Sequence, residues 1–388
     1  MNKIAVITGS RAEYGLLYWL MKELDSDKNI DFQLIVTGSH LSKDMGQTID
    51  FIQEDGFEVT YQVDMQLESD KPIGITSSMS KAIEGFGEAY NKIKPDLILL
   101  LGDRYEIFIA AAAATIFRIP IGHLHGGERT EGAFDEVFRH SLSKMSQLHF
   151  TAHNDYSNRV IQMGEQPENV YNVGALAIDN IKKLPLFSRK EVEERINLAF
   201  SGRNIIVTFH PTTLEKESSY DQFSNLLKNI DKLKNTSIIF TKSNADVDAR
   251  VIDNLIDEYV EKNSDKARAF TSMGQKLYLS TLQYVDATVG NSSSGIIEAP
   301  LFKIGTINIG DRQKGRFQVP SIINCLPNEN SISEAFEKLY SDEFQATLKR
   351  TKSPYGEGGA AKKIKEIVLE KLSNGDITLK KEFFDIKF

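Results

Sequence analysis

Short runs of apolar residues alternate along the chain with longer stretches in which apolar residues recur every three or four positions. The short runs are rich in leucine and β-branched residues, whereas the longer stretches follow a helical period. Apolar strands separated by helices in this way are typical of a parallel sheet that is covered on both faces. In the first half we expect strands at Lys3–Thr8, Phe32–Gly38, Asp96–Asp103, Ile119–Leu124 and Leu148–Thr151, and helices at Gly15–Leu24, Gln47–Gly56, Ser77–Ile93 and Ile107–Arg118.

The second half repeats this rhythm after a segment without a strand, Gly174–Glu194, which contains Pro185 and is the expected hinge. Further strands are expected at Asn204–Pro211, Thr236–Thr241, Ala267–Ser272, Asp286–Asn291 and Gly305–Gly310, with a helix at Tyr220–Leu233. We therefore predict an α/β fold of two doubly wound Rossmann-like domains that face a cleft. The predicted domains are residues 1–180 and 181–365, and a C-terminal helix or tail, 366–388, is expected to pack back on the first domain.

The composition is ordinary for a globular protein. Of 388 residues, 41% are hydrophobic and 26% are charged, which is enough apolar material for a core in each half. The net charge of −8, without a basic stripe or a basic amphipathic helix, argues against nucleic acid and membrane partners. The single cysteine, Cys325, cannot form an internal disulfide, and the polar Ser10 comes too early for a signal peptide. The longest apolar run, Ile107–Phe117, is too short to span a membrane. We therefore expect a cytoplasmic protein.

The most polar short stretches follow directly after the predicted strands. In doubly wound sheets, ligands bind outside the carboxyl ends of the strands, so these stretches are the candidate site. They are GSRAEYG (9–15), GSH (38–40), GDRYE (102–106), HGGERTEGAFDE (125–136), HP (210–211), GNSSSG (290–295) and GDRQKGR (310–316).

Three of these stretches suit an anionic ligand. The turn that contains Arg11 and the run Ser292–Gly295 expose backbone N–H groups and hydroxyls where a helix begins. The loop with Arg312, Lys314 and Arg316 supplies the positive charge that a diphosphate requires. Each stretch also has an ordinary explanation, namely a strand-to-helix turn, a serine cap or a solvated loop.

The remaining stretches carry acids and histidines. Asp103, Glu128 and Asp135 follow strand ends of one sheet, and carboxylates brought together raise one another's pKa, so one can act as an acid and another as a base. Asp135 and Arg139 also have the i,i+4 spacing of a surface ion pair. His210 ends a strand, where a histidine is more often structural. The sequence contains no HExxH motif or carboxylate cluster spaced for a metal, so we expect no metal and no cofactor.

In this order the motifs resemble those of the hydrolysing UDP-N-acetylglucosamine 2-epimerases of sialic-acid and legionaminic-acid biosynthesis. The resemblance extends over nearly the whole chain and implies a fold of the GT-B type, in which the C-terminal domain holds the nucleotide. It further implies a homodimer or homotetramer. The segments that carry it are ITGSRAEYGLL, VTGSHL, LGDRYE, HLHGGE, DEVFRHSLSKMS, FHP, GNSSSGIIE and INIGDRQKGR.

The resemblance also implies roles for single residues. Asp103 matches a catalytic acid/base, Asp135 the aspartate before an RH pair, and His210 a histidine near the diphosphate. The implied UDP-binding residues are Arg11, Arg104, Ser292, Ser293, Gly295, Glu298 for the ribose, and Arg312. Many family members read HxEGGE where this chain has His123–Glu128, so His125 replaces a glutamate, and His125 and Glu128 both remain candidates for the second acid/base.

The implied reaction converts UDP-N-acetylglucosamine and water to N-acetylmannosamine and UDP through a 2-acetamidoglucal. A closely related alternative is the hydrolysing 2-epimerase that acts on UDP-N,N'-diacetylbacillosamine in legionaminic-acid biosynthesis. A GT-B glycosyltransferase, which would need an acceptor, and a non-catalytic UDP-sugar sensor are two further alternatives.

Overall fold

The computed structural model describes residues 1–43, 47–69, 71–130, 135–211, 218–242 and 249–387. The chain forms two units. Unit 1 consists of Met1–Glu128, Phe134–Lys182 and Tyr355–Phe388, and unit 2 of Lys183–Pro354 with the short piece Arg129–Ala133. The main passage of the chain from unit 1 to unit 2 lies between Lys182 and Lys183. The return occurs at Tyr355, so residues 355–365 group with unit 1 instead of with the C-terminal domain in which they were expected.

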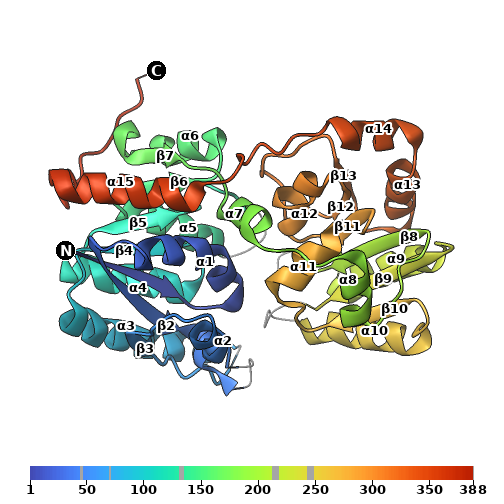
Figure 1. The fold of residues 1–388 in the computed structure, drawn as a ribbon, viewed down its shortest axis with the longest axis horizontal. Coiled ribbons are helices and arrows are strands. Elements are labelled where there is room, and N and C mark those ends of the chain that lie inside the picture. The colour runs from blue at the N-terminus through green and yellow to red at the C-terminus, as the bar shows by residue number, and fades with distance from the viewer. Residues whose placement is uncertain (44–46, 70, 131–134, 212–217, 243–248, 388) are drawn as a thin grey trace. The chain divides into compact units, whose positions relative to one another are not determined.

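Within the described residues, unit 1 contains a seven-stranded parallel sheet in the order β3-β2-β1-β4-β5-β6-β7 (Figure 1). The order reverses between β1 and β4, as in a doubly wound fold. The strands are β1 Asn2–Thr8, β2 Ile30–Thr37, β3 Tyr61–Val63, β4 Leu97–Leu101, β5 Ile121–Leu124, β6 Leu148–Thr151 and β7 Val170–Asn172. The helices are α1 Arg11–Asp25, η1 Gly38–Leu41, α2 Ile49–Glu54, α3 Pro72–Ile93, α4 Tyr105–Phe117, α5 Asp135–Met145, α6 Asn154–Gln162, η3 Pro167–Asn169, α7 Leu176–Lys183 and α15 Ala360–Asn374.

Successive residues of β1 point to opposite faces of this sheet and enter two different cores. Ile4 and Val6 pack in a core with Leu17 of α1 and with Val368 of α15. Ala5 and Ile7 pack in a second core, to which α3 and α4 contribute. Both faces of the sheet are therefore covered, which explains why its central strands read as continuous apolar runs.

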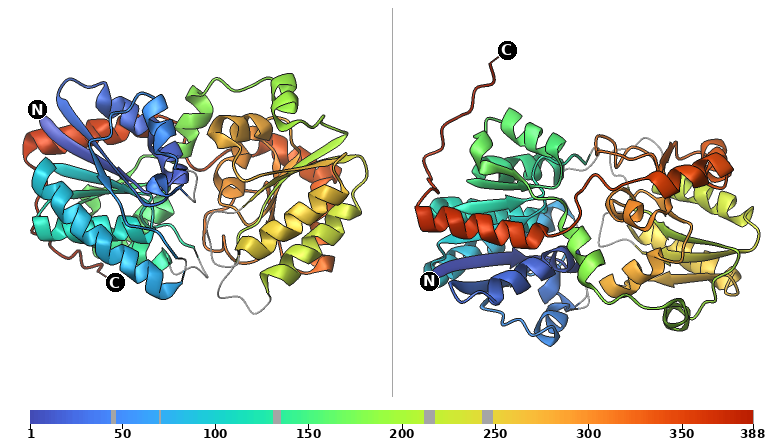
Figure 2. Two further views of the ribbon diagram at one scale, coloured as in Figure 1. Left: turned by 90° about the horizontal axis from the view of Figure 1, so that it is seen from below. Right: turned by 45° about the horizontal axis from the view of Figure 1, so that its top comes forward.

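Unit 2 contains a six-stranded parallel sheet in the order β10-β9-β8-β11-β12-β13, again within the described residues (Figure 2). Ile205 and Val207 of β8 pack with Phe223 of α9 in its core. The strands are β8 Arg203–Thr208, β9 Thr236–Thr241, β10 Ala267–Phe270, β11 Ala287–Gly290, β12 Gly305–Ile309 and β13 Ile322–Cys325. The helices are α8 Arg189–Ile196, α9 Ser219–Asp231, α10 Ala249–Lys262, α11 Gly274–Leu282, α12 Ser294–Ile297, η4 Ala299–Phe302, α13 Glu329–Leu339 and α14 Asp342–Arg350.

Three strands were not anticipated from the sequence: β3, β7 and β13. Each lies at the edge of its sheet and has only three or four residues. Runs this short show no clear period, and an edge strand is covered by fewer neighbours, so its sequence is less apolar.

The chain after α15 packs on unit 1 without forming a further helix. Residues 376–387, here called the C-terminal segment, contain no helix. They lie on unit 1 instead: the Lys381 ammonium donates to the backbone oxygens of Lys144 and Ser146, and the Phe384 N–H donates to Gly164 O. Charged and aromatic side chains therefore attach this segment without helical periodicity.

Candidate active site

The polar loops of unit 1 gather at the carboxyl end of its sheet, on both sides of the switch point between β1 and β4. Asp103 lies there, in the turn between β4 and α4. Arg139 of α5 donates a hydrogen bond to the Asp103 carboxylate, and its guanidinium also lies 3.8 Å from Glu136. Arg139 is buried, so its charge has little access to water. Arg139, which was considered as an ion-pair partner of Asp135, is thus an ion-pair partner of Asp103.

His123 of β5 holds the turn that carries Asp103. Its Nε2 lies 2.8 Å from the backbone oxygen of Gly102, and its Nδ1 lies 3.1 Å from Ser143 Oγ. Burial lowers the pKa of His123 to about 4, so the ring is neutral at physiological pH. A neutral imidazole that donates to Gly102 O accounts for both contacts. His123 is therefore a positioning residue that was not selected from the sequence, where it lies within the predicted strand Ile119–Leu124.

The two candidates for the second acid/base, His125 and Glu128, form one pair. Nδ1 of His125 lies 2.8 Å from Oε1 of Glu128, and both side chains are buried. His125 has a left-handed backbone with φ of 63°. Gly127 is also left-handed, and a Cβ there would lie 2.2 Å from the Tyr156 carbonyl oxygen. This close approach explains the glycine of the motif.

Arg104 and Arg11 lie on the two sides of the switch point. The Nε of Arg104 donates to Oε1 of Glu106 at 2.6 Å, so Arg104 forms an ion pair within unit 1. Arg11 is the first residue of α1, and burial lowers its pKa. Neither Glu106 nor Glu13 of α1 was selected from the sequence, although both belong to motifs that were. Both are buried beside Gly9.

In unit 2, Asn291 connects the ends of three strands. Its side chain accepts from the His210 N–H at 2.6 Å and donates to the His210 carbonyl oxygen at 2.8 Å. Its own carbonyl oxygen accepts from Arg312 at 3.1 Å and from Gln313 at 2.8 Å. Asn291 is buried, so these bonds replace its contacts with water. The structure thereby brings His210, Arg312 and the serine run together, through an asparagine that the sequence did not single out.

The serine run leads into α12, a helix of a single turn. Ser293 is the N-cap residue of α12, yet its side chain makes no capping hydrogen bond, so the serine-cap explanation does not apply to it. Ser292 Oγ accepts from the Ser294 N–H at 3.4 Å. Gly295 packs against β12, since a Cβ at this position would lie 2.7 Å from Thr306 Cγ2.

Glu298 ends α12 and is bound within unit 2. Its carboxyl accepts a hydrogen bond from Ser294 Oγ, which lies 2.6 Å from the Tyr278 hydroxyl. Burial raises the pKa of Glu298 to about 7. A carboxyl group in this state can accept or donate a hydrogen bond to a ligand hydroxyl near neutral pH.

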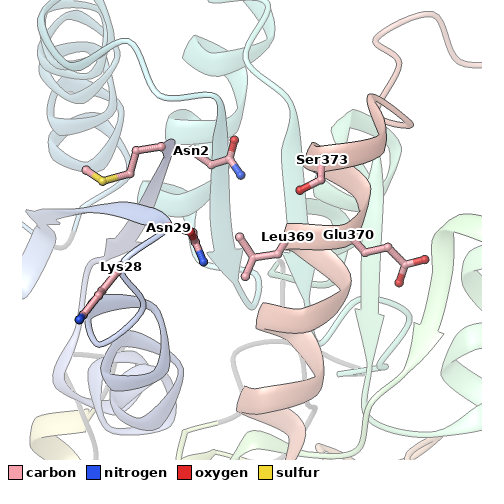
Figure 3. Close-up of a pocket in the computed structure, with 7 residues that line it drawn as sticks. Asn2, Lys28, Asn29, Leu369, Glu370 and Ser373 are labelled. Atoms are coloured by element: carbon pink, nitrogen blue, oxygen red, sulfur yellow. The ribbon is translucent and has the colours of Figure 1, made fainter.

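One hollow of unit 1 lies away from these residues. It measures about 640 Å³ and is lined by Met1, Asn2, Lys28, Asn29, Leu369, Glu370 and Ser373 (Figure 3). These residues surround the amino ends of β1 and β2, opposite to the polar loops. A smaller hollow of about 250 Å³ lies at the carboxyl ends of β2 and β3, beside Gly38 and Asp64.

Two further properties of the described residues concern metal binding and membrane-spanning helices. Within the described parts of the chain, no group of three or more histidine, cysteine, aspartate or glutamate side chains could hold a metal ion. No helix in the same parts is long and apolar enough to cross a membrane.

Comparison of the sequence with known proteins gives a match to the UDP-N-acetylglucosamine 2-epimerase family over residues 22–369. GDP/UDP-N,N'-diacetylbacillosamine 2-epimerase (hydrolyzing) of Campylobacter jejuni subsp. jejuni serotype O:2 is 41% identical over 385 residues, which cover 99% of both chains. Polysialic acid biosynthesis protein P7 of Escherichia coli is 38% identical over 100% of this chain and 98% of its own length. UDP-N,N'-diacetylbacillosamine 2-epimerase (hydrolyzing) of Legionella pneumophila is 33% identical over 84% of this chain and 85% of its own.

Solved structures show the same fold. UDP-GlcNAc 2-epimerase of Neisseria meningitidis, bound to UDP-GlcNAc, has a TM-score of 0.81 at 19% identity, over 95% of this chain and 100% of that one. UDP-GlcNAc 2-epimerase of Methanocaldococcus jannaschii, in complex with UDP-GlcNAc and UDP, has a TM-score of 0.77 at 19% identity, over 95% and 99% of the two chains. Together with the two parallel sheets, this likeness confirms the predicted architecture of two doubly wound α/β domains.

Proposed function

Because the chain belongs to the UDP-N-acetylglucosamine 2-epimerase family, we propose that it is a hydrolysing 2-epimerase that acts on a UDP-2-acetamido sugar. The observation that carries this proposal is the 41% identity, over 99% of both chains, to an enzyme named as a hydrolysing 2-epimerase. The substrate we propose first is UDP-N-acetylglucosamine, which with water would give N-acetylmannosamine and UDP.

The reaction requires a base at C2 of the sugar and stabilisation of the UDP that leaves from C1. A base removes the proton from C2 while the C1–O bond to UDP breaks, which gives a 2-acetamidoglucal. Water then adds at C1, and a proton returns to C2 from the other face. The C2 proton is not acidic, so C1–O cleavage must run ahead of proton removal and build positive charge on the ring. Anionic groups near the sugar and cationic or hydroxyl groups near the diphosphate therefore lower the barrier.

Unit 2 supplies the groups that we assign to UDP. Ser292, Ser293 and Arg312 would bind the diphosphate, with His210 held beside them through Asn291. The close packing of Gly295 on β12 places α12 against the sheet. Glu298 would bind the ribose, which its pKa of about 7 suits, because a carboxyl near neutrality both accepts and donates hydrogen bonds.

Unit 1 supplies the groups that we assign to the sugar. We propose Asp103 as one acid/base, with Arg139 beside it to keep its carboxylate ionised. The pair of His125 and Glu128 would supply the second proton-transfer group, and Asp135, the first residue of α5, would assist. In a paired His–Glu arrangement the carboxylate orients the ring and stabilises its charged form, so we assign proton transfer to His125 and its orientation to Glu128. Arg11 would contact the nucleotide from the start of α1, and Arg104 would act next to it.

A second substrate is favoured by a specific observation. Two of the relatives with at least 33% identity are named for N,N'-diacetylbacillosamine, and one of them is named for both GDP and UDP. The alternative function is therefore hydrolysing 2-epimerisation of UDP-N,N'-diacetylbacillosamine. His125, which differs from the glutamate of many family members, is the residue we expect to distinguish the two sugars.

Incubation with UDP-N-acetylglucosamine in heavy water, followed by NMR of the products, tests the proposal. We expect free UDP together with N-acetylmannosamine that carries deuterium at C2. The same assay with UDP- and GDP-linked N,N'-diacetylbacillosamine ranks the substrates by kcat/KM. Nucleotide release that depends on an added acceptor would instead identify a glycosyltransferase, and binding of every nucleotide sugar without turnover would identify a sensor.

We also propose that the enzyme acts in the cytoplasm as a homodimer or homotetramer. Ile116 of α4 and Val137 of α5 support self-association, since they are 78% and 67% exposed on adjacent helices. Light scattering coupled to size-exclusion chromatography measures the mass in solution, and a monomer at micromolar concentration would contradict this part of the proposal.

A further inference from the structure

Two buried glutamates flank Gly9, the residue between β1 and the candidate nucleotide-binding residue Arg11. We propose that Glu13 acts as a neutral carboxylic acid, that Glu13 and Glu106 together carry a single negative charge balanced by Arg104, and that this arrangement positions the turn Gly9–Arg11 for substrate. The part that concerns substrate rests on the proposed function, whereas the charge state of the pair does not.

The turn is fixed from three sides. The Gly9 N–H donates to Oε2 of Glu13 at 2.8 Å. The Gly9 carbonyl oxygen accepts from the Ser39 N–H at 2.8 Å and from Ser39 Oγ at 3.0 Å. On the remaining side, a Cβ at Gly9 would lie 2.6 Å from Cγ of Glu106. Any movement of either glutamate is therefore transmitted directly to the backbone that carries Arg11.

The two carboxyl groups are incompletely paired. Among the residues that the structure describes, Oε1 of Glu13 and Oε2 of Glu106 are buried and have no hydrogen-bond partner, and the two residues are 7% and 1% exposed. Burying a carboxylate oxygen without a hydrogen-bond partner raises the free energy of the folded state, and two neighbouring buried carboxylates raise it further because they repel each other. One proton added to the pair removes one of the charges and provides a donor. The remaining charge is matched by Arg104, whose Nε lies 2.6 Å from Oε1 of Glu106.

The electrostatics assign the proton to Glu13. Burial, and then the charge of Glu106, raise the pKa of Glu13 to about 8. Glu106 is the member that contacts Arg104, so it keeps the negative charge. The charged groups of the neighbouring elements agree with this assignment. His40 of η1 has its pKa lowered to about 4 by burial and is neutral, and Arg11 is the cation on the other side of the turn.

The pair therefore makes the turn sensitive to pH. Below about pH 8, Glu13 is neutral and still accepts from the Gly9 N–H. Above that pH, a second buried charge appears next to Glu106 and the pair separates or takes up water, which shifts the turn. For substrate, the expected consequence is a rise in KM above pH 8, because the turn is assigned to binding and not to proton transfer.

Glu13→Gln tests the proposal, because glutamine keeps the acceptor for Gly9 N–H but cannot ionise. We expect this variant to turn over UDP-N-acetylglucosamine at pH 7 within about twofold of the wild type and to lose the alkaline rise in KM. Glu13→Ala removes the acceptor and should raise KM by about tenfold at pH 7, the equivalent of one hydrogen bond. Glu54→Gln, on the exposed side of α2, is the matched control and should behave as the wild type. A glutamine variant as impaired as the alanine variant would overturn the proposal, and so would identical pH profiles of KM in Glu13→Gln and the wild type.

Thermal unfolding provides a second measurement that needs no substrate. The pKa of Glu13 is raised in the folded protein, so its contribution to stability is fully present below its unfolded pKa of about 4.5 and is lost as pH rises through about 8. The wild type should thus lose stability between about pH 5 and 8 relative to Glu13→Gln, with no further loss above that range. Parallel melting curves for the two proteins over this range would overturn the shared charge, whether or not UDP-sugars are substrates.

Discussion

At the scale of single residues, the site of unit 1 depends on charges that are held in place by buried partners. Asp103 sits on a turn fixed by His123 and faces the buried guanidinium of Arg139. A buried ion pair of this kind loses stability when one member is removed, because the other charge remains without compensation. A guanidinium beside a carboxyl group favours its ionised form, which is the state that a proton acceptor requires.

Asp103→Asn tests the assignment of this aspartate. The amide is nearly isosteric but cannot accept a proton, so we expect kcat to fall by about a hundredfold or more. UDP affinity, measured by calorimetry, should stay within about twofold of the wild type, since Asp103 is assigned to proton transfer and the diphosphate is assigned to Ser292, Ser293 and Arg312. Asp50→Asn, in the first turn of α2, is the control. A normal kcat in Asp103→Asn would exclude Asp103 from the chemistry.

In unit 2, Asn291 holds His210 in place, as His123 holds the turn of Asp103 in unit 1. Asn291→Ala removes both side-chain bonds to His210 while leaving the carbonyl that Arg312 and Gln313 contact. We expect UDP affinity to fall by about tenfold, the equivalent of one to two hydrogen bonds, with kcat at saturation nearly unchanged. Unaltered UDP binding in calorimetry would show that His210 needs no support from Asn291.

At the scale of elements, the C-terminal segment packs on unit 1 without forming a helix or a strand. Lys381 contacts Oε2 of Glu165 at 2.5 Å, and Lys144 contacts Oε1 of Glu165 at 2.6 Å. Glu165 also lies 3.0 Å from His149, on β6. The hydrogen bonds to His149, Lys144 and Lys381 outweigh the effect of burial and lower the pKa of Glu165 to about 2. Lys381 is thus one of the contacts that attach this segment, which has no regular structure, to unit 1.

Lys381→Met should lower the free energy of unfolding by about 1–3 kcal/mol, because Glu165 then loses one of its charged partners. Lys380→Met, the exposed neighbour, is the matched control and should have an effect below about 0.5 kcal/mol. Equal stability of the two variants in urea unfolding would show that the segment is not anchored in solution.

The pH dependence of this cluster has the opposite sign to that of Glu13. The pKa of Glu165 is depressed in the folded protein, so its contribution is present above its unfolded pKa of about 4.5 and is lost as pH falls toward about 2. Glu165→Gln should therefore flatten the acid limb of the stability curve, measured by circular dichroism between pH 5 and 2. A wild-type acid limb in this variant would contradict the assignment.

At the scale of the whole molecule, the proposed roles are divided between the units: the proton-transfer groups lie in unit 1, and the diphosphate- and ribose-binding groups lie in unit 2. A ligand that binds only the folded state stabilises it by mass action, by about 2.7 kcal/mol at a concentration of 100 Kd. We expect UDP to raise the unfolding temperature of the wild type and of Asp103→Asn equally. The double variant Ser293→Ala and Arg312→Ala should lose this response at the same UDP concentration, and a retained response would refute the diphosphate assignment.

Much of the fold and part of the candidate site could be predicted from the sequence. Central strands such as β4 are buried on both faces, so their apolar runs are unmistakable, and the rule for doubly wound sheets then selects the loops after them. The edge strand β13 has four residues and carries no such signal. Glu13 lay inside a selected motif but was passed over, because burial beside Glu106 depends on strand order and not on spacing along the chain.

The order of apolar and polar residues by itself determined the two-domain α/β architecture and the loops that we propose for the site, and the resemblance of its motifs indicated the family. These properties depend on local periods and on motifs of a few residues. Only the tertiary structure decided which charges meet: Arg139 with Asp103, and Lys381 with Glu165. The physical reason is that a pKa and an ion pair depend on burial and on distances of a few ångströms between residues far apart in the chain.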